Sequence, residues 1–380
     1  MEKFYDTFIQ TVKCGVGWGE LPKEGDWNKL FFLAKRHGLE SIFYNAIKDA
    51  EQVPDELKEA AKKQYLAQTA QQMSQEYYAE TFFEALRARG IRYMPLKGYV
   101  LRSLYPIPEH RTSCDVDVFY DREHGEDIEE ILTALGFTNE GDSVNHAQWT
   151  YQKTTLETHH DLAAQKDLYQ AYYEDVWSRL KTEDGVRYDF TDEDFYIYFM
   201  LHGAKHFSGG GFGMRTLLDI YIYNQAKVLD RAYIQAELEK LQIWTFTLQM
   251  ERLSRVLFAD EEGDETTELL SEYIFQSGTY GTEVNTAIRR GLQNNRSAKK
   301  AKRAYIITTI FPPYSLMKIL YPVLEKAPIL LPFAWVYKWF AVLFKRRKRL
   351  GAVMRNAQAF ETGKVEKSIK VMEAVGLSNE

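Results

Sequence analysis

Two aspartates that alternate with apolar residues constrain the fold of this chain more than any other feature. Residues 114–119 read Cys-Asp-Val-Asp-Val-Phe, so a single valine separates Asp115 from Asp117. Side chains in a β-strand alternate between its two faces, so the pattern predicts a strand with both carboxylates on one face. Neighbouring carboxylates repel each other, and a divalent cation such as Mg²⁺ relieves that repulsion. An edge strand with its polar face in solvent is the alternative for the triplet alone.

The segment before this strand has the pattern of a phosphate-binding turn. Residues 92–96 predict a short strand, and residues 99–105 predict a helix that ends at Pro106. Lys97 and Gly98 form the turn between them. The first amides of a helix have no partner within it, so such a junction suits a phosphate, and Lys97 adds positive charge.

A third acid follows in residues 155–159, whose composition predicts another strand. Glu157 and His159 share one face of that strand. If it pairs beside the strand of residues 114–119, the three carboxylates Asp115, Asp117 and Glu157 converge on one site. Such a site suits two metal ions and an in-line phosphoryl or nucleotidyl displacement.

Four blocks of this sequence resemble the uncharacterised nucleotidyltransferase family, whose catalytic fold is like that of DNA polymerase β. The blocks are Leu96-Lys97-Gly98, Leu104-Tyr105-Pro106, Asp115-Val116-Asp117-Val118 and Leu156-Glu157-Thr158-His159. A looser likeness extends over residues 27–312. The resemblance implies a mixed α/β fold with a polymerase-β-like nucleotidyltransferase core between N- and C-terminal helical subdomains.

The resemblance also implies roles for individual residues. Asp115 and Asp117 would bind two Mg²⁺ ions, with Mn²⁺ as an alternative, and Glu157 would complete the triad as a base or base-orienting group. Gly98 would lie near the phosphates of the donor nucleotide. The Gly-Ser of the wider superfamily is replaced here by Lys97-Gly98-Tyr99, so a serine hydroxyl is missing. This departure leaves the identity of the donor open.

The implied activity is metal-dependent transfer of a nucleoside monophosphate, AMP from ATP, to an unidentified hydroxyl or phosphate acceptor, with release of pyrophosphate. Two other classes stay open. The pair His160-Asp161, with His146 and Asp219, has the scattered pattern of an HD-type metal phosphohydrolase, although that class needs the pair on a helix. The third class is a catalytically silent nucleotide-binding or antitoxin-like module.

Three basic residues are candidates for contacts with the phosphates of a nucleoside triphosphate, namely Arg111, Lys205 and Arg215. Arg215 lies four residues before Asp219, so an internal ion pair is an equal alternative for it. An ion pair within a loop is the corresponding alternative for Arg111.

The pattern of predicted elements divides the chain into four regions. Residues 1–85 are a helical subdomain, 86–190 the nucleotidyltransferase core, 191–284 a helical subdomain that completes the cleft, and 285–380 a basic, aromatic-rich helical region. The two cysteines, Cys14 and Cys114, are too few for a disulfide framework or a zinc cluster. Without a signal-peptide pattern, we expect a cytoplasmic protein.

The C-terminal region carries a strong positive charge. Residues 285–355 contain 16 Lys and Arg but one acid, Glu325, in a chain of net charge −6. Aromatic blocks and the run 345–349 predict peripheral contact with an anionic membrane through residues 327–349, at the inner face. Pro332 and Lys338 argue against a transmembrane helix. A helical pair packed on the protein and a contact with RNA are the alternatives.

Overall fold

The computed structural model describes residues 3–143, 145–162, 167–279, 281–292, 298–345, 360 and 362–377. The chain forms two compact units. The first contains residues 1–202 and 214–263, and the second contains residues 203–213 and 264–380. The helix α8 (Asp192–Gly209) contributes to both units. The predicted regions 1–85 and 86–190 both fall within the first unit, and the four-part division stays a prediction.

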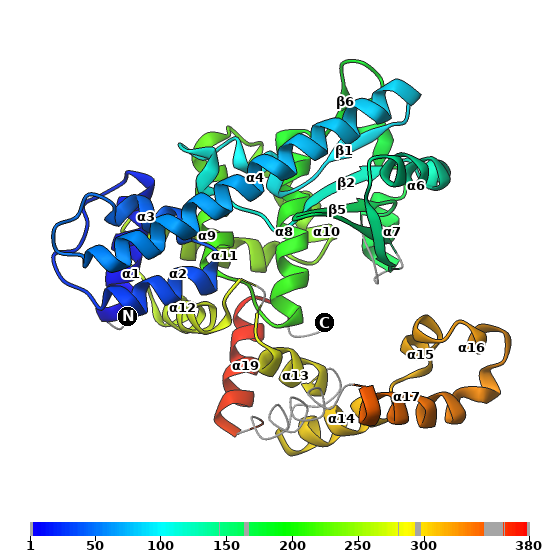
Figure 1. Cartoon of the computed structure of the whole chain (residues 1–380). Coiled ribbons are helices and arrows are strands. Elements are labelled where there is room, and N and C mark those ends of the chain that lie inside the picture. The colour runs from blue at the N-terminus through cyan, green and yellow to red at the C-terminus, as the bar shows by residue number, and fades with distance from the viewer. Residues whose placement is uncertain are drawn as a thin grey trace. The chain divides into compact units, whose positions relative to one another are not determined.

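Helices form the N-terminal part of the first unit, as the sequence predicts (Figure 1). They are α1 (Lys3–Val16), α2 (Trp27–His37), α3 (Glu40–Ile47) and α4 (Asp55–Arg89). The long helix α4 contacts α3 near one end and the sheet and α6 (Gly125–Ala134) near the other. It ends at Gly90, whose φ of 67° is the left-handed conformation that glycine adopts at low cost.

A five-stranded mixed sheet forms the rest of the core of this unit. Its strands are β1 (Tyr93–Pro95), β2 (Val116–Tyr120), β3 (Thr138–Asp142), β4 (His146–Tyr151) and β5 (Thr154–His159), in the order β1-β2-β5-β4-β3. Only the central pair β2 and β5 is parallel. The fold is therefore mixed α/β, as predicted.

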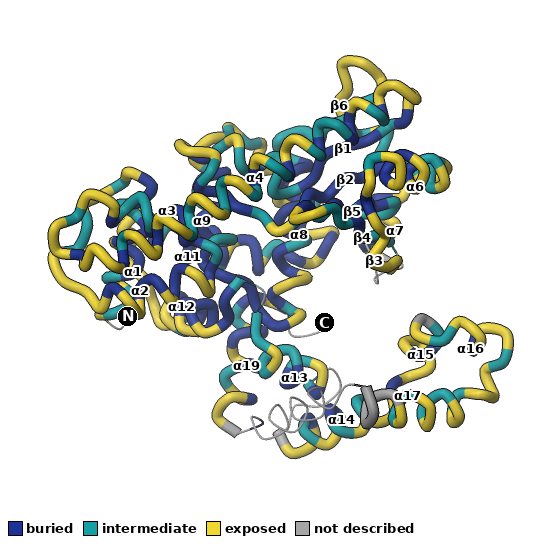
Figure 2. The backbone as a smooth tube through the Cα atoms, viewed as in Figure 1, coloured by how far each residue is buried: buried dark blue, intermediate teal, exposed yellow. Residues whose placement is uncertain are grey.

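The two faces of the sheet differ in chemistry. Val116 and Val118 of β2 and Leu156 of β5 pack in one hydrophobic cluster with α4 and α6. Because side chains alternate, Asp117 and Glu157 project from the opposite face. Every residue of β2 is buried, as its dark blue colour in Figure 2 shows. The sheet thus holds its acids on a rigid, buried pair of strands.

The remaining elements surround this framework or form the second unit. In the first unit they are α5 (Gly98–Arg102), α7 (Asp167–Tyr173), the two-residue strands β6 (Lys181–Thr182) and β7 (Tyr188–Asp189), α9 (Met214–Ala226), α10 (Arg231–Lys240) and α11 (Trp244–Phe258). In the second unit they are α12 (Glu265–Ser277), α13 (Glu283–Leu292), α14 (Ala298–Ile310), α15 (Tyr314–Leu320), α16 (Val323–Lys326), α17 (Leu331–Lys345) and α19 (Thr362–Ala374).

Candidate functional site

The parallel pairing of β2 with β5 brings two of the three predicted acids, Asp117 and Glu157, together. In its register Asp117 lies opposite Glu157, and Phe119 lies opposite His159. One ligand atom each from Asp117, Glu157 and His159 lies within 4.8 Å of the other two. Ligands that share one cation are separated by similar distances, so the donor set fits a divalent metal. The strand of Glu157 therefore pairs beside the strand of Asp117, which is the condition on which the predicted convergence of the acids depends.

Asp117 is the most constrained member of this cluster. Its Oδ1 accepts a hydrogen bond of 2.8 Å from Nε2 of His159 and lies 3.3 Å from Nζ of Lys97. Burial alone would raise the pKa of Asp117, but Lys97 and His159 hold that pKa well below its usual value. Among the described residues both contacts engage Oδ1, which leaves Oδ2 for a further ligand.

Asp115 lies directly before β2, not within it, and is half-buried. Burial raises its pKa, and the charge of Asp117 raises it further. The backbone in front of Asp115 is fixed by α4, because Gln72 Nε2 donates to the Ser113 carbonyl at 2.7 Å and Gln75 Nε2 donates to the Cys114 carbonyl at 2.8 Å. Two buried glutamines therefore hold the backbone directly before Asp115.

Glu157 is half-buried beside the two aspartates. Burial raises its pKa first, and the charges of Asp117 and Asp115 raise it further. Among the groups described, the three acids Asp115, Asp117 and Glu157 thus have one ammonium close by, that of Lys97. A bound cation would lower the electrostatic cost of this arrangement.

His159 is the site residue that the sequence prediction omitted. It is buried, donates to Asp117, and lies 3.7 Å from Glu157 Oε2 through Nε2. Its ring also lies 5.1 Å from that of His146 on β4. The signal was available, since His159 is two residues after Glu157 and shares its face.

Helix α8 adds two residues near the acids. The pKa of Tyr198 rises to about 12, chiefly through burial, and the charges of Lys97 and Asp117 also act on it. His202, one turn further along the helix, lowers the pKa of Asp117 through its charge. Both belong to the part of α8 that lies in the first unit.

The Lys97-Gly98 turn is strained and closely packed. Lys97 has a φ of 40°, which is uncommon for a residue with a side chain. A Cβ at Gly98 would lie 3.3 Å from Cβ of Ser113, so only glycine fits there without a shift. Burial would lower the pKa of Lys97, but Asp117, Tyr198 and Asp115 raise it above its usual value. The ammonium is therefore held charged beside Asp117, and phosphate contacts by Lys97 and Gly98 stay predictions.

The three other predicted cations differ in their surroundings. Arg111 is buried and donates through Nε to Asp219 at 2.8 Å, an ion pair between distant parts of the chain and not the pair within a loop that was the alternative for Arg111. Arg215 donates to the Thr112 carbonyl at 2.9 Å, and its positive charge opposes the rise in the pKa of Asp115. Lys205 is exposed and belongs to the second unit. Nucleotide contacts by these residues stay predictions.

The pair His160-Asp161 directly follows β5 instead of lying on a helix. Asp161 accepts a 3.0 Å hydrogen bond from Arg122, and Asp219 is committed to Arg111. This arrangement does not match the helical His-Asp pair of an HD-type phosphohydrolase.

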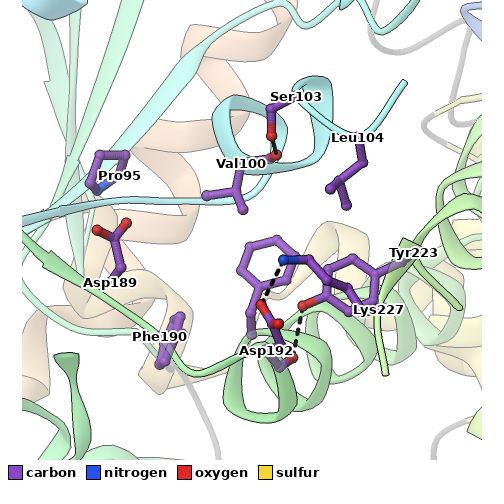
Figure 3. A pocket seen from close by; sticks show the side chains of 10 residues that line it. Pro95, Val100, Ser103, Leu104, Asp189, Phe190, Asp192, Tyr223 and Lys227 are labelled. Atoms are coloured by element: carbon purple, nitrogen blue, oxygen red, sulfur yellow. Dashed lines mark hydrogen bonds and ion pairs between the residues drawn. The ribbon is translucent and has the colours of Figure 1, made fainter. Parts of the chain in front are cut away.

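A pocket of the first unit lies beside α5 (Figure 3). An ion pair of 2.9 Å between Lys227 and Asp192 crosses it, and Tyr223 donates to the Asp192 carbonyl. It is lined by Pro95, Val100, Ser103, Leu104, Asp189, Phe190, Asp192, Phe195, Tyr223 and Lys227. Because no member of the acidic cluster lines it, we assign it no part in the chemistry.

Fold and site together define an α/β protein whose central strands carry an acidic cluster that can accommodate a metal ion. A family model described as uncharacterised nucleotidyltransferase matches residues 23–259, and the chain belongs to this family. No curated protein and no solved structure matches this chain.

Proposed function

We propose that the chain transfers a nucleoside monophosphate from a nucleoside triphosphate, ATP in the first instance, to a hydroxyl or phosphate acceptor. The observation that supports this most is the opposition of Asp117 and Glu157 on paired parallel strands, with His159 beside them, in a member of a nucleotidyltransferase family. The proposed core is polymerase-β-like.

Asp115, Asp117, Glu157 and His159 would hold the divalent metal, Mg²⁺ or Mn²⁺. When bound, the metal supplies positive charge that offsets the negative charge of the phosphates. Nζ of Lys97 lies beside the same carboxylates and adds a fixed cation. Arg215, whose charge already acts on Asp115, is the next candidate for a phosphate contact.

In the proposed reaction the acceptor oxygen attacks the α-phosphorus of ATP. A bond forms between that oxygen and phosphorus, the bond to the β-phosphate oxygen breaks, and pyrophosphate leaves. The acceptor proton passes to Glu157, which acts as the base or base-orienting group of the cluster. The acceptor itself is not specified by the residues of the site.

The test is a pyrophosphate-release screen with α-labelled ATP, Mg²⁺ or Mn²⁺ and a panel of acceptors. We expect label on an acceptor and release of pyrophosphate, both lost in Asp117→Asn and Glu157→Gln. Glu129→Gln, an exposed carboxylate on α6 outside the cluster, serves as the control and should retain activity. Tight ATP binding by the native chain without turnover on any acceptor would favour a silent nucleotide-binding module, and inorganic phosphate as the product would favour a hydrolase.

A further inference from the structure

The second unit carries an unusual concentration of exposed apolar side chains. More than half of the large apolar side chains that are exposed in the described residues lie between Ile307 and Phe340. Figure 2 shows long exposed stretches along α15, α16 and α17. Large contiguous apolar surfaces are uncommon on soluble domains and mark places where something else binds.

One face of α17 is used within the unit. Nε1 of Trp335 donates to the Pro312 carbonyl at 2.9 Å, Nζ of Lys338 to that of Thr309 at 2.8 Å, and Nε1 of Trp339 to that of Ile310 at 2.7 Å. These carbonyls lie at or just past the C-terminal end of α14, where no helical amide satisfies them. The positive charge of Lys338 also suits a helix C-terminus. This face therefore orients α17 on α14.

The other face of α17 is apolar and largely exposed, with the ring of Tyr337 in edge contact with that of Tyr321 at a centroid distance of 5.9 Å. Phe333 is 72% exposed, Val336 42%, Tyr337 66% and Phe340 56%. Their spacing of three and four residues places them on one stripe, opposite Trp335, Lys338 and Trp339. Ile329, 85% exposed, precedes the same helix. The inner face thus holds the helix in place while the outer face presents aromatic and aliphatic groups.

Positive charge accompanies this stripe. The described residues 298–345 contain one acid, Glu325, against eight basic residues, which are Lys299, Lys300, Lys302, Arg303, Lys318, Lys326, Lys338 and Lys345. The sequence continues to Arg349 with four further cations, which lie outside the described residues. Among the residues described, no helix is long and apolar enough to cross a bilayer.

We infer that α17, with the segment from Ile329, is an interfacial element that lies in the headgroup region of an anionic membrane. An exposed aromatic stripe gains free energy from burial at the acyl boundary, and the surrounding cations are attracted to acidic headgroups. RNA would satisfy the positive charge but not the exposed stripe, since base stacking needs aromatics interleaved with cations. A protein partner would satisfy the apolar stripe but not, equally well, the positive charge. This inference does not depend on the proposed activity.

The test is flotation of the full chain with vesicles of phosphatidylcholine alone and of an equimolar mixture with phosphatidylglycerol. We expect flotation with the anionic vesicles at low salt, and little with the neutral ones. Phe333→Ser combined with Phe340→Ser should weaken the partition at least about tenfold. Phe32→Ser is the matched control, because Phe32 is 63% exposed on α2 in the first unit and should leave flotation unchanged.

Three results would overturn the inference. The first is no flotation with anionic vesicles at low salt. The second is flotation that the double variant retains while its circular dichroism and thermal transition match those of the native chain. The third is a self-association, seen by light scattering without lipid, that the double variant abolishes along with any flotation. Salt-sensitive binding of polyuridylate without vesicle binding falls under the first and would point to RNA.

Discussion

The ammonium of Lys97 lies 3.3 Å from Oδ1 of Asp117, inside a cluster that also contains Asp115 and Glu157. The side chains of both partners are largely buried, with exposed fractions of 19% and 8%. Lys97 is thus an internal counter-ion of the acidic cluster, and the charges of Arg215 and Arg111 also act on Asp115. Lys97 stabilises the carboxylates in the absence of metal, but its single positive charge does not balance three carboxylates.

Replacing Lys97 with methionine should make the protein depend on metal for stability. Loss of one partner from a buried pair costs about 3 kcal/mol in the free energy of unfolding. We expect that loss in Lys97→Met with a chelator present, and recovery of most of it in Mn²⁺. Denaturant titrations under both conditions measure it. Lys29→Met, which breaks the exposed pair with Asp26, should change little. Equal stability of Lys97→Met and the native chain in chelator would contradict this account.

Gln75→Leu should weaken the site without touching a carboxylate. Gln75 is buried and holds the Cys114 carbonyl, next to Asp115. The variant leaves that carbonyl unsatisfied, which costs roughly 1–3 kcal/mol of stability, and it releases the backbone that carries Asp115. Metal affinity measured by calorimetry should fall in the fraction that stays folded. Gln235→Leu on α10, which breaks an exposed bond to Glu239, should alter neither quantity.

Asp219→Asn should reduce stability strongly. Its carboxylate accepts from Arg111 at 2.8 Å and from the Tyr105 hydroxyl at 2.6 Å, and all three side chains are buried. We expect a loss of about 3 kcal/mol in the free energy of unfolding, since Arg111 keeps its charge without a partner. Asp161→Asn breaks the exposed pair with Arg122 and should cost under about 1 kcal/mol. Similar losses in the free energy of unfolding in the two variants would contradict a strongly stabilising role for the buried pair of Asp219 and Arg111.

His110 predicts a dependence of stability on pH. Burial lowers its pKa from 6.5 to about 4, so the folded state binds fewer protons than the unfolded state between these values. The free energy of unfolding should therefore fall as the pH drops below about 6.5, by at most about 3 kcal/mol at pH 4. His110→Gln should remove this component of the slope. Thermal melts at closely spaced pH values give the comparison, and an unchanged slope in the variant would rule His110 out as its source.

The central strands could be predicted from sequence because their patterns are local. Alternation around Asp117 and around Glu157 identifies β2 and β5, and the apolar residues between the acids fix which face is buried. By contrast β3 is exposed at every position, so no alternation marked it. The spacing places His159 on the same face as Glu157, but its hydrogen bond to Asp117 depends on the pairing of β2 with β5, which spacing alone does not give.

Long-range pairings were beyond the sequence. Arg111 meets Asp219 across 108 residues, and nothing near either residue indicates that pair over the phosphate contact or the ion pair within a loop that were considered for Arg111. Nothing in the sequence of α4 marks Gln72 and Gln75 as buried, whereas the structure places them against the segment before β2. The burial of these glutamines follows from the packing of α4 on the sheet, and that packing depends on the whole fold.

Direct measurement of metal binding tests the central claim most sharply. Isothermal titration of the native chain with Mn²⁺, in parallel with Asp117→Asn and Glu157→Gln, reports whether these oxygens act together. We expect binding by the native chain and a loss of at least about tenfold in affinity in each variant. Native-like Mn²⁺ affinity in both variants, with their thermal transitions intact, would contradict a shared metal site at β2 and β5.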